Sequence, residues 1–324
     1  MKRVMRLAFL LLPAVAFAAI AQPAPVIGYL GPESPELFAS RLAAFKRGLA
    51  ETNYAEARNV NIEYRWAYGD NARLPALAAE LVARKVSVLV ATGSAAGALA
   101  AKKASSTIPI VFEVGVDPVA SGLVHSMNRP GGNATGVTSL NTGLGPKRLQ
   151  LLRELVPGMK SFALLVNPTN PSNAEAMIDD LQVAAHAQRL QFRIVRAATE
   201  SDLTVVFENL ARERVDALVL ANDTFFVHRS KEIAALALRH RIPAIHQPPE
   251  FVAAGGLVSY AGSFQESHRL AGIYTGRVLR GDKPADLPVQ QVNKMELFVN
   301  AKTARALGLT VPRSIISRAD RVIE

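Results

Sequence analysis

The stretch from Val86 to Gly122, VSVLVATGSAAGALAAKKASSTIPIVFEVGVDPVASG, decides the fold class of this chain. It begins with a short apolar, β-branched run, as expected for a strand that is buried on both faces. Thr-Gly-Ser at 92–94 then starts a run of helix formers, and a second strand at 109–112 leads to Asp117-Pro118, a pair that predicts another helix. Two strands therefore deliver two polar turns to one edge of a parallel sheet, where open α/β sheets bind small ligands.

The alternation of strands and helices continues on both sides of this stretch. It runs from residue 26 to residue 140, restarts near 146 and continues to about 250. Repeated strand–helix units of this kind predict parallel sheets with helices on both faces. The sequence therefore predicts an α/β protein with two Rossmann-like lobes.

The last residues are too few for a third domain, so we expect them to complete both lobes. The chain would then cross between the lobes near Leu140, Gly256 and Gln290. The first lobe would comprise 22–140 plus 256–289, and the second 141–255 plus 290–324. Paired crossing segments form a hinge, and closure of two lobes about a hinge is a common response to a ligand.

The N-terminus carries the features of an export signal. Lys2, Arg3 and Arg6 precede an apolar run that ends at Ala19-Ile20-Ala21, which predicts a signal peptide over 1–21 with cleavage before Gln22. The alternative, a membrane anchor, is disfavoured because the run contains Pro13 and is shorter than the roughly 18–20 residues that span a bilayer. The chain has no cysteine, which excludes disulfides, thiolate metal sites and a lipid-modified cysteine. We therefore expect a periplasmic protein.

Composition and motifs disfavour nucleic-acid binding and catalysis. The formal net charge is +10, but the basic residues are scattered singly rather than gathered in a run. The six histidines show no metal-binding spacing, and the sequence contains no nucleophile elbow, phosphate loop or dinucleotide fingerprint. We therefore predict no nucleic-acid partner, no catalytic residues, no metal and no cofactor.

Polar residues at predicted strand ends are the candidate ligand-binding groups. Thr92 and Ser94, with the amides of Gly93 and Ser94, could hold a carboxylate at a helix N-terminus, although ordinary helix capping explains them equally well. Asp117 could accept a ligand ammonium, with helix capping again as the alternative. Asp223 and Asn167 follow strands of the second lobe, and Asp223 is the other candidate for the ammonium.

Several segments together resemble a known family. They are Arg65–Asp70 (RWAYGD), Ala91–Ala96 (ATGSAA), Arg129–Gly136 (RPGGNATG) and the tail from Ala304 to Glu324. In this order they resemble the exported substrate-binding proteins of ABC transporters, some of which are tied to tryptophan or tyrosine uptake.

The resemblance implies a type 1 periplasmic-binding fold, with two lobes joined by a three-strand hinge. It also implies a pocket between the lobes, formed by turns that match Gly31 to Ser34, Thr92 to Ser94, Asp117, Asn167, Asp223 and Tyr260. The expected function is capture of a small zwitterion, such as an amino acid, by a monomer that docks on an ABC permease. A sensor module for a receptor kinase and an exported enzyme on a Rossmann-like scaffold are the alternatives.

Overall fold

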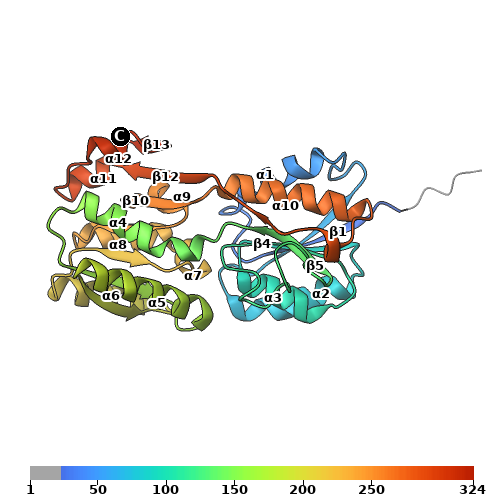
Figure 1. Cartoon of the computed structure of the whole chain (residues 1–324), viewed down its shortest axis with the longest axis horizontal. Helices are drawn as coiled ribbons and strands as arrows, with labels where there is room; N and C mark the ends of the chain where they lie inside the picture. Colours follow the sequence, from blue (N-terminus) through green and yellow to red (C-terminus); the bar gives the residue numbers. More distant parts are fainter. Residues whose placement is uncertain (1–22) are drawn as a thin grey trace, which may run out of the picture.

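The computed structural model describes residues 23–324, so the predicted signal peptide at 1–21 lies outside the described residues. No helix in this described part is long and apolar enough to cross a membrane. The chain forms two lobes that lie side by side, each with a central sheet and helices packed against it (Figure 1).

The first lobe is built on a six-stranded, wholly parallel sheet with the order β11-β5-β4-β3-β1-β2. Its strands are β1 (Val26–Gly31), β2 (Asn61–Trp66), β3 (Val88–Thr92), β4 (Ile110–Val114), β5 (Ala134–Thr138) and β11 (Gln290–Gln291). Its helices are α1 (Ala39–Ala50), η1 (Asn71–Arg73), α2 (Leu74–Ala83), α3 (Ala95–Ala104), α10 (Phe264–Leu279) and η3 (Pro284–Asp286).

The second lobe is built on a seven-stranded sheet with the order β13-β12-β10-β9-β8-β6-β7, in which β12 runs antiparallel to β10. Its strands are β6 (Ser161–Val166), β7 (Gln191–Arg196), β8 (Leu218–Leu220), β9 (Ala244–His246), β10 (Val258–Gly262), β12 (Met295–Asn300) and β13 (Arg321–Ile323). Its helices are η2 (Asn141–Leu144), α4 (Gly145–Leu155), α5 (Pro171–Gln188), α6 (Glu200–Arg212), α7 (Thr224–His228), α8 (Ser230–Arg239), α9 (Pro249–Ala253), α11 (Ala301–Ala306) and α12 (Arg313–Ile316).

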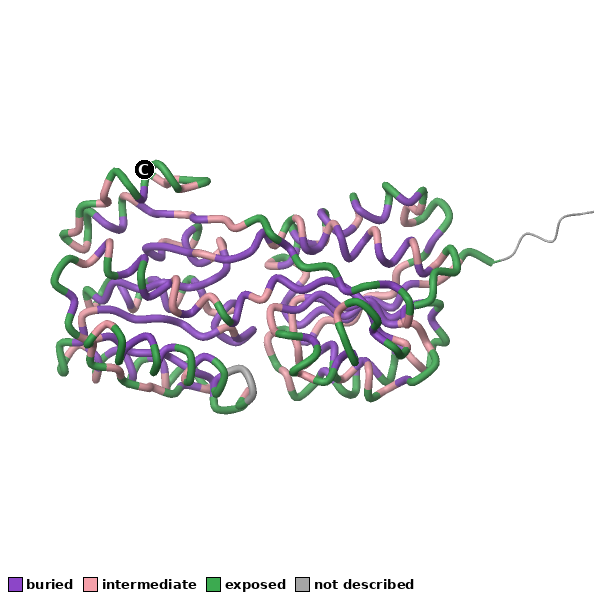
Figure 2. The backbone as a smooth tube through the Cα atoms, viewed as in Figure 1, coloured by how far each residue is buried: buried purple, intermediate pink, exposed green. Residues whose placement is uncertain are grey.

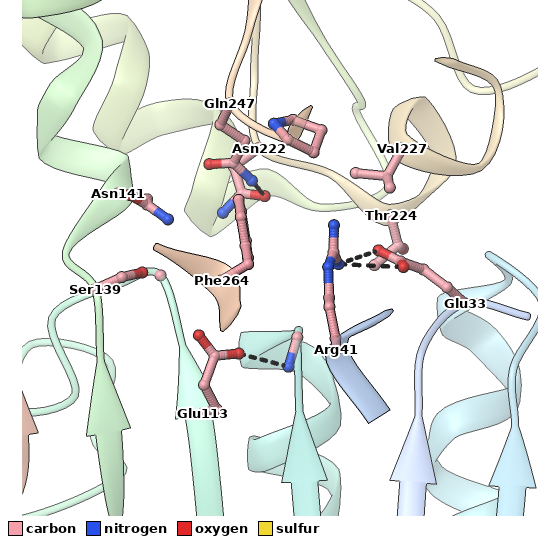
Figure 3. Close-up of a pocket in the computed structure, with 13 residues that line it drawn as sticks. Glu33, Arg41, Glu113, Ser139, Asn141, Asn222, Thr224, Val227, Gln247 and Phe264 are labelled. Carbon is pink, nitrogen blue, oxygen red and sulfur yellow. Dashed lines mark hydrogen bonds and ion pairs between the residues drawn. The ribbon is translucent and has the colours of Figure 1, made fainter. Parts of the chain in front are cut away.

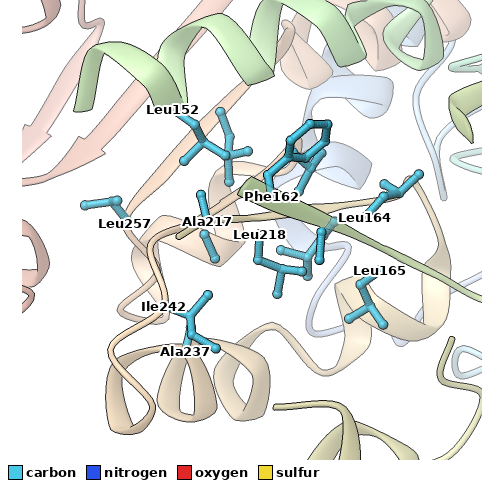
Figure 4. Packing of buried hydrophobic residues seen from close by; sticks show 14 of the residues in the cluster. Leu152, Phe162, Leu164, Leu165, Ala217, Leu218, Ala237, Ile242 and Leu257 are labelled. Atoms are coloured by element: carbon cyan, nitrogen blue, oxygen red, sulfur yellow. The ribbon is translucent and has the colours of Figure 1, made fainter. Parts of the chain in front are cut away.

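Both sheets reverse their strand order next to the first strand, between β1 and β3 and between β6 and β8. This is the doubly wound arrangement that the sequence predicts, so the expectation of two Rossmann-like lobes is confirmed. The inner strands β3 and β4 are fully buried, as Figure 2 shows for the sheets of both lobes. Apolar side chains from the sheet and its helices, such as Phe162, Leu218 and Leu152, form the continuous core of the second lobe (Figure 4).

One predicted helix is absent from the opening stretch. Residues 117–122 form a single hydrogen-bonded turn, in which Ser121 N–H donates to the Asp117 carbonyl and Gly122 N–H to the Val119 carbonyl. The turn ends at Gly122, which has a φ of 74°, a conformation that favours glycine. Asp117 therefore caps a turn rather than a helix.

The chain passes between the lobes after β5, after β10 and between β11 and β12. The second of these passages follows Gly262 rather than lying near Gly256, because β10 is an inner strand of the second sheet. Backbone hydrogen bonds join the passages, from Ser263 N–H to the Lys294 carbonyl and from Val292 N–H to the Thr138 carbonyl. The three segments together form the hinge.

Helix α10 returns from the hinge to the first lobe and lies directly against α1 (Figure 1). The two backbones approach so closely that glycine is required at the contact. A Cβ atom on Gly272 would lie 2.1 Å from the Phe45 carbonyl oxygen, and one on Gly48 would lie 1.8 Å from the Arg269 carbonyl oxygen. This contact anchors the returning segment to the first lobe.

Replacing Gly272 by alanine should therefore destabilise the protein. Forcing the two helices apart is expected to cost about 1–3 kcal/mol, which outweighs the roughly 1 kcal/mol that alanine gains in helix propensity. Urea unfolding of the chain from residue 22 measures the difference. Gly132→Ala is the matched control, because no atom lies within 4 Å of its added Cβ, and it should change the unfolding free energy little. Equal stability of the two variants would contradict the helix contact.

Candidate functional site

The carboxyl ends of both sheets face each other across a polar cavity (Figure 3). The cavity encloses about 350 Å³ of unfilled space, solvent-connected space included. Its lining comes from both lobes and from the hinge, and consists of Glu33, Arg41, Gly93, Glu113, Gly115, Ser139, Asn141, Asn222, Thr224, Val227, Gln247, Pro248 and Phe264. Sites at this edge are typical of doubly wound sheets, because polar turns from neighbouring strands meet there.

Arg41 of α1 connects the two lobes at one side of the cavity. Its Nη1 lies 3.2 Å from both carboxylate oxygens of Glu33, and its Nη2 donates to Glu250 of α9 in the second lobe over 2.9 Å. The guanidinium also lies over the Phe264 ring, 4.4 Å from its centroid. Arg41 is 2% exposed and the Glu250 side chain is 21% exposed, so a partly buried ion pair links the lobes in the present arrangement.

Burial raises the pKa of Glu33 to about 7, because the desolvation of its carboxylate outweighs the attraction of Arg41. Burial alone would lower the pKa of Arg41, but the carboxylates of Glu250 and Glu33 raise it above its ordinary value. Arg41 is therefore charged, while Glu33 exchanges its proton near neutrality.

Glu113 lies at the end of β4, on the floor of the cavity (Figure 3). Its carboxylate accepts a hydrogen bond of 3.0 Å from the Gly93 amide and is 2% exposed. The Nε2 atom of His268 lies 3.6 Å from it. However, burial lowers the pKa of His268 against the opposing effect of Glu113, so the imidazole is neutral. Among the described residues, Glu113 has no cation within ion-pair distance.

The second lobe contributes amides and a hydroxyl to the cavity. Gln247 Nε2 donates to Asn222 Oδ1, while Gln247 Oε1 is buried without a partner among the described residues. The hydroxyl of Thr224 donates to Asn71 Oδ1 of the first lobe over 3.2 Å. This contact forms a second bridge between the lobes.

A wider cavity lies on the other side of this bridge. It is lined by residues of both lobes: Tyr68, Gly69, Asp70, Asn71, Ala72, Ala96, Asn167, Thr169, Ala198, Phe225 and Arg229. Asn71 lines this outer cavity, and its partner Thr224 lines the inner one. The Asn71–Thr224 hydrogen bond therefore lies between the two spaces.

Of the predicted site residues Thr92, Gly93, Ser94 and Asp117 in the first lobe, one lines the inner cavity and three do not. Gly93 lines the inner cavity. Thr92 instead pairs with the Tyr29 hydroxyl over 2.8 Å, and the Ser94 side chain caps α3 by accepting from Gly97 N–H. Asp117 is exposed and accepts from the amides of Val119 and Ala120. Ser94 and Asp117 therefore make capping contacts, the alternative to ligand binding, whereas Thr92 makes a buried contact with Tyr29 that the sequence did not predict.

The remaining predicted residues also have structural partners. Gly31 ends β1 and is buried against Trp66, and the Ser34 hydroxyl accepts from Leu37 N–H. In the second lobe, Asp223 accepts from the side-chain amides of Asn167 and Asn170, at 2.8 and 2.9 Å. Asn167 lines the outer cavity, whereas the Tyr260 carbonyl accepts from Arg148 at the hinge.

Two charged lining residues were not singled out from the sequence although they carry a detectable signal. Glu113 is an acidic residue inside the apolar strand Ile110–Val114, where a buried charge needs a partner. Arg41 is three residues after Phe38 and four before Phe45, so it shares the buried face of α1. A charge on an apolar face was the signal in both cases.

The protonation of Glu33 predicts a pH dependence of stability. The pKa of Glu33 is about 7 in the folded protein, whereas the ordinary pKa of a free glutamate side chain is 4.5, so the folded state binds more protons between these two pH values. Protonated Glu33 therefore contributes to the free energy of unfolding in full below pH 4.5, and this contribution is lost as the pH rises through 7. Glu33→Gln should flatten this fall, as measured by urea unfolding across the interval. The exposed Glu208→Gln should leave it intact, and an unchanged slope in Glu33→Gln would contradict the assignment.

Comparisons with known proteins agree with this architecture. The chain is 27% identical over 267 residues to a tyrosine-binding protein of Clostridioides difficile (strain R20291), covering 82% of this chain and 75% of the relative. Among solved structures, a conserved domain protein from Vibrio cholerae matches with a TM-score of 0.85 at 24% identity. An ABC domain from Streptococcus pneumonia in complex with L-Trp matches with a TM-score of 0.84, also at 24% identity. Both alignments cover 92% of this chain and 99% of the other.

A family model also covers nearly the whole described chain. The model for the ABC transporter substrate binding protein family matches residues 33–323. Together with the doubly wound lobes and the hinge, this match confirms the resemblance and the fold expected from it. The chain therefore belongs to the family of ABC transporter substrate-binding proteins.

Proposed function

We propose that this protein is the receptor of an ABC importer for an α-amino acid, which it binds as a zwitterion in the inner cavity. It would act in the periplasm as a monomer, perform no chemistry, and present the closed, ligand-bound form to a membrane permease. Family membership supports the transport role. The names of the tyrosine-binding relative and the L-Trp complex support an amino acid as the ligand class.

The observation that carries the proposal is the isolated carboxylate of Glu113. It is buried at the meeting point of the lobes, hydrogen-bonded to the Gly93 amide and faced by a neutral imidazole. A buried charge is costly unless it is paired, so this position favours a ligand that brings a cation. An α-ammonium group satisfies that requirement. We therefore assign the ammonium to Glu113 rather than to Asp117 or Asp223. Glu113 lines the inner cavity, whereas Asp117 is exposed outside that lining and the Asp223 carboxylate accepts hydrogen bonds from two side-chain amides.

Closure of the lobes would couple binding to transport. Arg41–Glu250 and Asn71–Thr224 link the lobes in the present arrangement. A ligand shifts the equilibrium towards this arrangement only if it binds the closed form more tightly than the open one. Contacts from both lobes to one ligand would provide that difference, because opening the hinge removes half of them.

A thermal-shift screen of the chain from residue 22 against the twenty standard amino acids tests the ligand class. A ligand at 100 times its dissociation constant should stabilise the protein by about 2.7 kcal/mol. Absence of a shift with all twenty would refute the proposal.

Glu113→Gln tests the assigned ammonium contact. The substitution keeps the shape of the side chain but removes its charge, so the affinity for the amino acid should fall about 100-fold in calorimetric titration. The ligand-free variant should be at least as stable as the parent, because an unpaired buried carboxylate is removed. Asp117→Asn is the control and should bind normally, because Asp117 is exposed and caps its own turn. The reverse pattern would restore Asp117 as the ammonium partner.

A further inference from the structure

Arg148, near the start of α4, is a fully buried cation at the hinge. Its side chain is 0% exposed. Its Nε donates to the Tyr260 carbonyl and its Nη2 to the Asn141 carbonyl, each over 2.9 Å. Nη1 is buried and has no hydrogen-bond partner among the described residues. Arg148 therefore ties the first hinge passage, at Asn141, to β10, the strand that leads into the second passage.

The charge of Arg148 is uncompensated in the described part of the chain. No carboxylate there lies within ion-pair distance of its guanidinium, and burial lowers its pKa to about 9. The nearby His246 supplies no negative charge either, since burial and the charge of Arg148 lower its pKa to about 3 and keep it neutral. Burying a guanidinium without a counterion is costly. At the hinge end of the site, two carbonyl dipoles face the charge of Arg148 and no carboxylate of the described residues neutralises it.

Asn141 connects Arg148 to the cavity, because it contacts Arg148 and also lines the cavity. Its backbone carbonyl accepts from Arg148, and its side-chain Oδ1 accepts from Gly262 N–H over 2.7 Å. Because the side-chain oxygen is occupied in this way, the Nδ2 amide group is the one left facing the cavity, as Figure 3 shows. Ser139 lies beside it on the same wall of the cavity. A neutral donor therefore faces the ligand, with a buried cation behind it.

We propose that the hinge end of the cavity is the carboxylate subsite, in which Asn141 donates to the ligand and Arg148 is the positioning residue that orients it. This inference rests on the proposed amino-acid receptor function and extends it to the orientation of the ligand. The ammonium end lies at Glu113 in the first lobe, and the carboxylate end lies at Asn141 and Ser139 on the hinge. The ammonium of the zwitterion thus faces the carboxylate of Glu113, and its carboxylate faces the end of the site behind which the cation Arg148 is buried. The carboxylate lies against the first hinge passage, so its binding favours one arrangement of that passage relative to β10, to which Arg148 ties it.

The subsite is tested by comparing L-tyrosine with two analogues that lack the carboxylate, tyramine and L-tyrosinamide. If another amino acid gives the largest shift in the screen, its own amine and amide replace them. The parent protein should bind the amino acid about 100-fold more tightly than either analogue, because a buried site that holds a charged group rejects a ligand without it. Calorimetric titration gives the three affinities.

Asn141→Asp should reduce this preference at least about tenfold, since it places an acceptor carboxylate opposite the ligand carboxylate. Its affinity for the amine should be retained. Arg148→Lys keeps the charge but must donate from a single nitrogen and loses the planar fork that holds the two carbonyls in place, so it should reduce the preference, although less than Arg148→Met does. The exposed Arg153→Met, on the same helix, is the control and should leave the preference unchanged.

The outcomes separate this inference from the proposed function. If no amino acid binds the parent protein, the receptor proposal fails and this inference fails with it. If the parent binds the amino acid but Asn141→Asp and Arg148→Lys keep its full preference over the amine, the carboxylate subsite is refuted and the receptor proposal stands. Loss of amino acid and amine in equal measure would assign Asn141 and Arg148 a purely structural role. Asn141→Asp and Arg148→Lys decide the question even if Arg148→Met does not fold.

Discussion

The hydrogen bonds between the three hinge passages are the constraint on which the rest of the molecule depends. Ser263 and Val292 donate across the passages through their backbones, and Gly262 donates to the Asn141 side chain. These bonds join the two lobes where the carboxyl ends of the parallel strands of each sheet face each other. Strand-end residues of both lobes then line one shared cavity, although each lobe has its own core. The site therefore belongs to neither lobe alone.

Some of the buried charges around this space are paired with one another, and others are not. Glu33, Arg41 and Glu250 neutralise one another in part, and this cluster also joins the lobes. Glu113 and Arg148, by contrast, lie at different parts of the site without partners of opposite charge among the described residues. Such charges are costly in an empty cavity. A zwitterion would pair its ammonium with Glu113 and place its carboxylate at Asn141, in front of the buried charge of Arg148, and this links the ligand class to the orientation proposed for it.

Local sequence patterns predicted the fold well because they reflect local physics. Buried β-branched runs and helix formers predicted a strand, a helix and a second strand in the stretch from Val86 to Phe112, and the structure has β3, α3 and β4 there. Strand-end reasoning was less successful for individual side chains. Ser94 and Asp117 occupy positions where a ligand group and a helix or turn cap look alike in sequence, and both side chains make the capping contacts. Glu113 and Arg41 were detectable as charges on apolar faces, but their partners were not.

The sequence by itself therefore determined the class of fold, the two lobes, the family and the edge of the sheet at which a ligand would bind. Those properties follow from periodicity, turn residues and ordered motifs, which act over a few neighbouring residues. Only the tertiary structure decided which charges remain unpaired at that edge. Arg148, Asn141 and Tyr260 meet across 112 residues of chain, and Arg41 meets Glu250 across 209. Whether a buried charge is satisfied depends on such distant contacts, because its energy is set by all the groups around it in space.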